Sequence, residues 1–185
     1  MMLNLERADR ELLLRCAREV IRARLERRAA SLPQKTEPLG QPGGAFVTLH
    51  EGPSLRGCIG RMSSPEPLFD TICSMAAAAA FEDPRFPPLK ADELERIDIE
   101  ITLLSPLRAI TDPTEIQVGL HGIYLVKGWQ SGVLLPQVAT EQGWDRATFL
   151  EQTCRKAGLP PGSWKSPDAT ISIFEGLIFG ERDPG

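Results

Sequence analysis

The sequence predicts an α+β fold in which helices cover a mixed, largely antiparallel sheet. Segments whose apolar residues recur every three or four positions are interspersed with segments in which apolar and polar residues alternate. The alternating segments come in pairs joined by short turns, as β-hairpins do. A hairpin followed by a helix occurs twice along the chain, and this order favours an antiparallel sheet with helices packed on it.

The size, composition and charge of the chain limit the kinds of protein that it can be. Its 185 residues, 42% of them hydrophobic and 25% charged, are enough for one globular domain with a sizeable core, or for one domain with two lobes. A net charge of −4 argues against a dedicated nucleic-acid binder. The apolar runs are shorter than the ~18 residues of a membrane helix, and charge appears by Glu6, too early for a signal peptide. We therefore expect a cytoplasmic protein that binds neither membranes nor nucleic acid.

The first part of the chain predicts one long helix and a surface connector. Residues 4–28 carry a single apolar stripe, with Asn4 as a candidate cap and Cys16 on the stripe. Residues 32–44 are rich in proline and glycine and lack periodicity, which is typical of a loop.

A β-hairpin and a second helix follow. Residues 45–50 and 55–61 alternate around a turn, so they are expected to pair as strands. The next helix is expected to begin at Ser64 as its cap, with prolines in its first turn. The alanine run at residues 76–80 has no bulk, so this helix is expected to approach the sheet closely.

The second half of the chain repeats these signals. Residues 97–104 alternate as a half-buried strand, and residues 110–119 form a polar connection. A second hairpin is predicted at residues 121–127 and 133–136, then a helix from Asp145 to Ala157, then closing strands at 170–174 and 177–180.

The segment Leu55–Gly60, with the sequence LRGCIG, is the candidate centre of the functional site. It places Cys58 near Arg56 and between Gly57 and Gly60, so that a ligand or a neighbouring backbone can come close. On a regular strand, Arg56 and Cys58 share a face, and a nearby cation favours the nucleophilic thiolate. Tight packing of a small cysteine under a helix is the alternative explanation of the same pattern.

The proline-rich loop after the second helix supplies two more candidates. Three prolines at positions 84, 87 and 88 stiffen it, and they hold Asp83 and Arg85 in set directions. Arg85 can bind an anionic ligand. Alternatively, the two residues form a local ion pair that steadies the loop.

His121 is the candidate base. It begins a predicted strand, and with Glu100 or Asp83 to orient it, a Cys58–His121–acid arrangement is possible. A hydrogen-bonded turn residue before Gly122 is the alternative. With two histidines and four cysteines, none in a C-x-x-C pair, we expect neither a metal site nor a disulfide framework, and the sequence identifies no cofactor.

Six motifs occur in one order between about Leu12 and Glu181: LRGCIG, the loop at 83–88, and the segments 119–122, 135–139, 143–145 and 156–159. Together they resemble the AMMECR domain family, called protein A of the AmmeMemoRadiSam system in microbes. The resemblance implies a two-lobed α+β fold with LRGCIG near a cleft between the lobes. We expect one AMMECR-type domain over 1–185, with a larger lobe at roughly 1–110, a smaller one at roughly 111–185, and closing strands that can return to the larger lobe.

The resemblance also implies Memo-like and radical-SAM protein partners, but no settled activity. Three interpretations of the site compete. The first is a thiol enzyme that uses Cys58 as nucleophile or redox group. The second is a binding module in which Arg56 and Arg85 hold a small anionic molecule. The third is a nucleic-acid protein, which the acidic balance and the single tyrosine oppose.

Overall fold

The structure is a computed structural model that describes residues 5–183, so the predicted cap Asn4 lies outside the described residues. The chain divides into two compact units. Of the described residues, unit 1 contains 5–104 and 177–183, and unit 2 contains 105–176. Helices and antiparallel strands occur in both, which confirms the α+β class.

Unit 1 contains the elements predicted for the first half of the chain. They are α1 (Arg7–Leu25), β1 (Gly44–Glu51), β2 (Ser54–Arg61), α2 (Leu68–Phe81) and β3 (Ile97–Leu104). The predicted hairpin is confirmed, because β1 pairs antiparallel with β2 along one side and with β3 along the other. β2 therefore forms one edge of the sheet.

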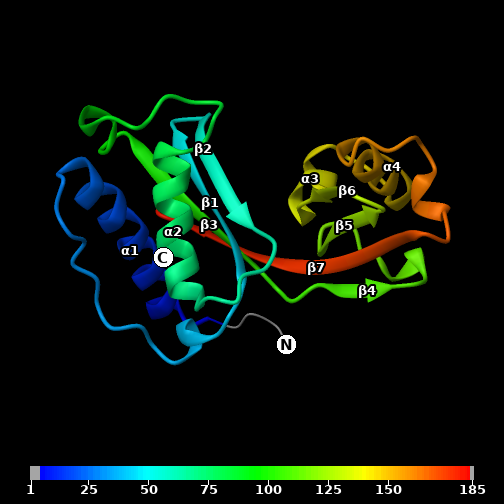
Figure 1. Cartoon of the computed structure of the whole chain (residues 1–185), viewed down its shortest axis with the longest axis horizontal. Coiled ribbons are helices and arrows are strands. Elements are labelled where there is room, and N and C mark those ends of the chain that lie inside the picture. The colour runs from blue at the N-terminus through cyan, green and yellow to red at the C-terminus, as the bar shows by residue number, and fades with distance from the viewer. Residues whose placement is uncertain (1–4, 184–185) are drawn as a thin grey trace. The chain divides into compact units, whose positions relative to one another are not determined.

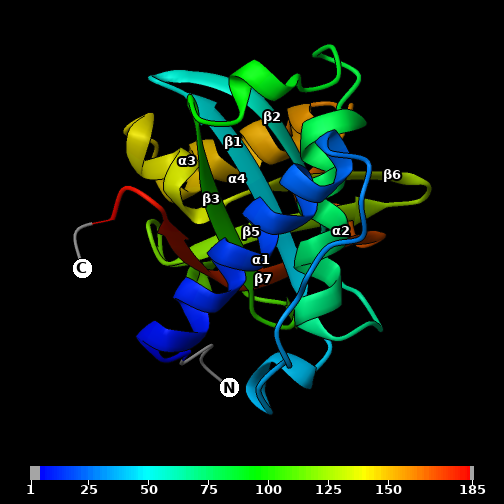
Figure 2. The ribbon, with the colours of Figure 1, turned by 90° about the vertical axis from the view of Figure 1, so that its left-hand side faces the viewer.

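Both helices of unit 1 cover the same face of its sheet, as Figures 1 and 2 show. α2 packs on β1 and β2, and α1 packs on α2 and β3. A Cβ atom on Gly57 would overlap the carbonyl oxygen of Ala79 in α2. The expected close approach of the alanine-rich helix therefore occurs, and it needs a glycine at that position of β2.

The two faces of this sheet differ in polarity because side chains alternate along each strand. The helix-covered face is buried and apolar, with Val47, Leu49, Ile99 and Ile101 in the core. The opposite face carries side chains at the even positions of β1 and β3, and most of these are only half-buried. Polar groups on this open face include Thr48, Cys58 and Glu100, which lie opposite one another across β2, β1 and β3.

The start of α2 differs from the prediction. The helix begins at Leu68, and Pro67 precedes it. The hydroxyl of Ser64 instead accepts a hydrogen bond from the backbone N–H of Glu66 at 3.1 Å. Two closely spaced prolines at positions 65 and 67 bias the residues before them away from helical geometry, so helix formation starts only after the second.

Unit 2 is a smaller sheet with two helices. The predicted second hairpin occurs as β5 (His121–Lys127) and β6 (Gln130–Leu134), but its turn is shorter than predicted and the returning strand begins at Gln130 instead of residue 133. The helix capped by Asp145 is α4 (Arg146–Lys156). Two elements were not predicted: β4 (Arg108–Ile110), which ends where the predicted polar connection begins, and α3 (Pro136–Glu141). Short 3-10 helices lie at Pro38–Gly40, Ala91–Glu93, Pro113–Glu115 and Ser163–Lys165.

The two predicted closing strands are one continuous strand, β7 (Ala169–Gly180), drawn as the long red arrow in Figure 1. Its first part pairs with β4 and β5 in unit 2. Its last part pairs with β3 in unit 1, where the backbone N–H of Glu181 also donates to the carbonyl oxygen of Ile99 at 3.0 Å. The prediction of a break was wrong because Glu175 and Gly176 continue the extended backbone.

No helix within residues 5–183 combines the length and the apolar character that crossing a membrane requires.

Candidate functional site

The backbone of Cys58 lies at the exposed edge of the sheet, where β2 has no neighbouring strand. Two side chains take the place of that strand. The N–H of Cys58 donates to Oδ2 of Asp83 at 2.9 Å, and Nη2 of Arg85 donates to the carbonyl oxygen of Cys58 at 3.3 Å. The loop after α2 therefore clamps β2 at the cysteine, and it satisfies backbone groups that an edge strand leaves unpaired.

Asp83 and Arg85 form a two-pronged ion pair. Nε of Arg85 lies 2.9 Å from Oδ1 of Asp83, and Nη2 lies 2.7 Å from Oδ2. The backbone N–H of Arg85 also donates to Oδ1 at 3.1 Å, which fixes the turn. The hydrogen bonds from Arg85 hold the pKa of the Asp83 carboxyl well below its usual range despite its burial. The loop-steadying role considered for this pair is therefore present in the structure.

The two members of that pair differ in exposure. The Asp83 side chain is 2% exposed, whereas the Arg85 side chain is 55% exposed. The pKa of Arg85 is raised, mainly by its hydrogen bonds to Asp83 and in smaller part by the negative charge of that carboxylate. Within the described residues, Nη1 of Arg85 makes no hydrogen bond, so one edge of the guanidinium is available to a ligand.

The thiol of Cys58 lies beside the hydroxyl of Thr48. The two residues are directly opposite each other in β2 and β1, and Oγ1 of Thr48 donates to Sγ at 3.3 Å. Because the amide and carbonyl of Cys58 point to Asp83 and Arg85, this is a pair without backbone hydrogen bonds between its members, the kind in which cross-strand side chains come closest. Cys58 is half-buried, so its sulfur is not sealed in the core.

The other three cysteines are placed differently. Cys16 and Cys154 are buried, and burial raises the pKa of both thiols. Cys73 is half-buried in α2, where desolvation raises its thiol pKa to about 12. These three thiols are thus held in the protonated, unreactive form at neutral pH.

The two glycines of the motif permit close packing within unit 1. Gly57 lies under Ala79, as described above, and a Cβ atom on Gly60 would overlap the ring of Phe46 directly across the hairpin. At both positions the close neighbour in the structure is a part of this chain. Their predicted contact with a ligand stays a prediction.

Arg56 is engaged within unit 1. The pairing of β1 with β2 shifts in register between Leu49 and His50, and Arg56 is the extra residue of the resulting β-bulge. A bulge interrupts the regular alternation of side chains, and the expected position of Arg56 beside Cys58 depended on that alternation. Nε of Arg56 donates to Oε1 of Glu93 at 2.7 Å, and Nη2 donates to the carbonyl oxygen of Pro87 at 3.0 Å. The arginine that contacts Cys58 is Arg85, through the backbone carbonyl oxygen. The predicted ligand-binding role of Arg56 stays a prediction.

His121 belongs to unit 2, whereas Cys58 belongs to unit 1. His121 is 7% exposed, and its Nδ1 accepts a hydrogen bond from the backbone N–H of Gln117 at 3.1 Å. This bond requires an unprotonated Nδ1, which places the proton of the neutral ring on Nε2. The contact is that of a turn residue, the alternative considered for it, and its role as a base stays a prediction.

Two residues of the site were not predicted. Thr48 and Glu93 become neighbours of Cys58 and Arg56 only through strand pairing and loop folding, 10 and 37 residues away along the chain. A signal for Thr48 was present, since it lies on the polar side of an alternating strand. Within residues 5–183, no group of three or more His, Cys, Asp or Glu side chains is arranged to hold a metal ion.

Comparisons with known proteins show what this chain and its fold are similar to. A family model described as AMMECR1 matches residues 14–179. A protein of Methanopyrus kandleri is 43% identical to this chain, and the match covers 94% of this chain and 89% of that protein. A protein of Nanoarchaeum equitans is 41% identical, and the match covers 91% of this chain and 98% of that protein. The crystal structure of an uncharacterised protein from Pyrococcus horikoshii has a TM-score of 0.87 and 38% identity, over 97% of this chain and 95% of that one.

Proposed function

The chain belongs to the AMMECR1 family, and we propose that this member binds a small anionic molecule at the edge of β2, between Arg85 and Cys58. The observation that carries the proposal is the uneven engagement of Arg85. Its Nε and Nη2 are committed to Asp83 and to the backbone of Cys58, while the rest of its guanidinium is exposed to solvent. A planar guanidinium fixed along one edge presents its other N–H groups in a defined direction, which is what carboxylate and phosphate oxygens require.

The charges at the site predict a selective but modest affinity. Asp83 neutralises the formal charge of Arg85, so the attraction for an anion comes from directed hydrogen bonds and less from net charge. The oxygens of Asp83 are turned inward to Cys58 and Arg85, which keeps their charge away from an approaching anion.

The test is a titration of ¹⁵N-labelled protein with inorganic phosphate, acetate and succinate, followed through the Arg85 Nε–H signal and the Cys58 amide. We expect saturable shifts of both signals with at least one anion, and loss of the Cys58 shift in Arg85→Ala. Arg61→Ala is the matched control. Arg61 lies on the same strand as Cys58, is exposed, and has only a 3.7 Å contact with Glu66. Equal binding by the wild type and Arg85→Ala would refute the proposal.

A second candidate is thiol chemistry, with Cys58 as nucleophile or redox group. The observation that favours it is the 3.3 Å contact from Thr48 to Sγ, since a hydroxyl donor stabilises a thiolate. The half-buried position also leaves the sulfur more open than the buried Cys16 and Cys154.

This candidate is tested by iodoacetamide labelling with mass-spectrometric site assignment. We expect Cys58 to be alkylated at least tenfold faster than Cys73, and Thr48→Val to slow Cys58 severalfold. If Cys73 reacts as fast as Cys58, a special reactivity of this thiol is excluded.

We propose partnership with Memo-like and radical-SAM proteins on the basis of the sequence motifs alone. Co-expression of the tagged chain with each partner candidate from the same organism, followed by affinity purification, tests it. Recovery of neither partner at stoichiometric amounts would count against the association.

A further inference from the structure

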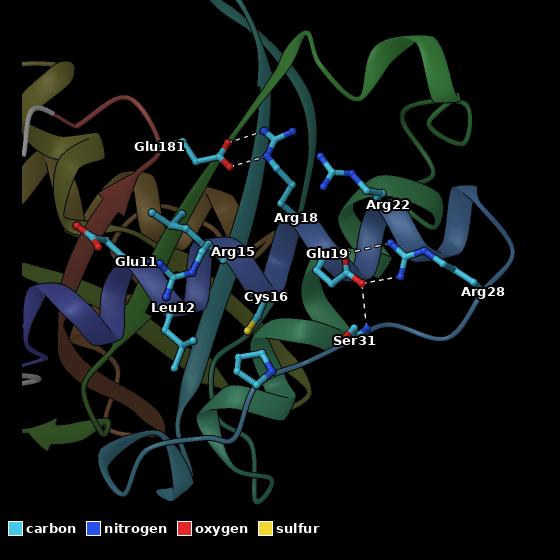
Figure 3. Close-up of a pocket in the computed structure, with 12 residues that line it drawn as sticks. Glu11, Leu12, Arg15, Cys16, Arg18, Glu19, Arg22, Arg28, Ser31 and Glu181 are labelled. Carbon is cyan, nitrogen blue, oxygen red and sulfur yellow. Dashed lines mark hydrogen bonds and ion pairs between the residues drawn. The ribbon is translucent and has the colours of Figure 1, made fainter.

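A pocket of about 940 Å³ lies in unit 1 alongside α1 (Figure 3). Its walls come from the outer part of that helix, from the connector that follows it, and from Glu181 just after β7. The volume is within the range of about 300–1,000 Å³ that small-molecule sites occupy. No residue proposed above for the edge of β2 lines it, so it is a separate candidate site.

The carboxylates of the pocket are already paired with arginines. Glu181 accepts two hydrogen bonds of 2.6 Å from Arg18, and Glu19 accepts one of 2.6 Å from Arg28, as the dashed lines in Figure 3 show. The hydrogen bond from Arg28 and another from the N–H of Ser31 lower the pKa of Glu19 to about 2. The negative charges around the pocket are thus compensated by the protein itself.

Glu11, the remaining carboxylate of the lining, is also compensated. It pairs at 2.8 Å with Arg7, one helical turn earlier on α1 and outside the lining. Hydrogen bonding to Arg7 lowers the pKa of Glu11, so it is ionised and engaged at neutral pH.

Two of the four arginines in the lining are not paired with a carboxylate of the lining. Within residues 5–183, Arg15 makes no hydrogen bond or ion pair. Arg22 has only a 3.5 Å contact with Glu95, whose side chain is 80% exposed and free to leave. The two arginines are seven residues apart, about two turns or ~10 Å along one side of α1. The lining therefore carries a positive excess on one side.

The part of the lining beside Arg15 is apolar. Leu12 and Leu14 are only half-buried on α1, Pro33 of the connector lies across from them, and Cys16 contributes from the core. In Figure 3, Arg15 and Leu12 lie close together on one side of the pocket, while Arg28 and Ser31 close the other. A surface with a cationic rim and an apolar floor is complementary to a ligand that is charged at one end and hydrophobic along its body.

We propose that this pocket binds a small anionic amphiphile, with its carboxylate or phosphate head on Arg15 and Arg22 and its hydrocarbon body on Leu12, Leu14 and Pro33. The three carboxylates of the lining are each paired with another arginine, although Glu11 also attracts Arg15. The apolar body removes half-exposed leucine surface from water, which supplies the length-dependent part of the affinity.

The experiment is a calorimetric titration of the full chain with decanoate below its micellar concentration. We expect saturable binding with one site per chain, and at least tenfold weaker binding by the double variant Arg15→Gln/Arg22→Gln. Arg24→Gln is the matched control, because Arg24 lies on the same helix but pairs with Glu82 and stacks on Phe81, away from the pocket. It should bind decanoate like the wild type.

Two further probes measure separately how the charged head group and the hydrocarbon body of the ligand contribute to the affinity. Decanol, which lacks the charge, and hexanoate, which lacks four methylene groups, should each bind at least tenfold more weakly than decanoate. Unsaturable binding to the wild type, equal affinity in the double variant, or equal affinity for decanol would each overturn the proposal. If the double variant does not fold, as judged by circular dichroism, the single variants Arg15→Gln and Arg22→Gln decide the same question.

Discussion

Two arginine–carboxylate pairs flank β2, and they use the same chemistry in opposite ways. In the Arg56–Glu93 pair both side chains are largely buried, at 9% and 14% exposure, whereas in the Arg85–Asp83 pair only the acid is buried. Both arginines also approach the ring of Phe86, with guanidinium carbons 5.9 and 5.5 Å from its centre. The ring of Phe86 is thus approached by one arginine that is buried and by one that is exposed to solvent.

The difference shows that an arginine near a motif indicates a ligand site only when one of its N–H groups is both unpaired and exposed to solvent. Arg56 directs its hydrogen bonds to Glu93 and Pro87, and its Nη1 is buried without a partner within the described residues. Arg85 retains an exposed edge. Stability should therefore depend most on the first pair, and ligand binding on the second.

The largest expected effect is that of Arg56→Met. It leaves the Glu93 carboxylate largely buried without its cation, and breaking such a pair costs about 3–5 kcal/mol. Urea unfolding followed by circular dichroism measures the loss. Adding Glu93→Leu should restore much of it, because the unpaired charge is then gone; a loss below about 1 kcal/mol would mean that the pair is not enclosed in solution.

A smaller loss is expected for Asp83→Ala. The substitution removes the acceptor of the Cys58 N–H at the sheet edge, and hydrogen bonds to a charged group contribute about 1.5–3 kcal/mol. The freed Arg85 is exposed and adds little penalty of its own. Amide hydrogen exchange at Cys58 should quicken along with the loss of stability, and unchanged exchange there would contradict the clamp.

The acid dependence of stability should also reveal Asp83. Its pKa is lower in the folded chain than in the unfolded chain, so its contribution is fully present above the unfolded value of about 3.9 and is lost as pH falls toward the folded value. Between pH 4 and pH 2 the wild type should therefore lose stability more steeply than Asp83→Asn. Parallel curves for the two proteins would show that this carboxyl is not perturbed by folding.

The smallest effect on stability is expected for Arg85→Ala, at about 1 kcal/mol or less. Its side chain is mostly exposed, so water can reach Asp83, which keeps hydrogen bonds from two backbone N–H groups. Thermal unfolding measures this change beside the loss of anion binding. A large decrease in melting temperature would assign Arg85 to loop structure and erase the contrast with Arg56.

Local signals were sufficient to predict most elements. The alternation at 45–61 predicted β1 and β2, and Asp145 with Gly158 predicted both ends of α4 to within a residue or two. α3 was missed because Leu135 and Pro136 continue an apolar strand, and a proline read there as the end of a strand is instead the first residue of a helix. Such short helices depend on the packing of residues like Ala139, which no local pattern reports.

The candidate site was only partly predictable. Cys58, Asp83 and Arg85 were selected from the stiffness and reactivity of their segments, and the structure brings these three together. The bulge at Arg56 depends on the register of β1 with β2, and the pairing of Arg56 with Glu93 joins residues 37 positions apart. A change in register of one residue redirects a side chain, so the partner of Arg56 could not follow from the order of residues in its own strand.

The continuity of β7 has a consequence for how the protein is made. Each unit takes one of its strands from Ala169–Gly180. During translation the strands of both units stay incomplete until this segment has left the ribosome, although α1 and the first hairpin emerge earlier. Until then β3 and β5 each lack the neighbour that β7 supplies, and a single segment completes both units.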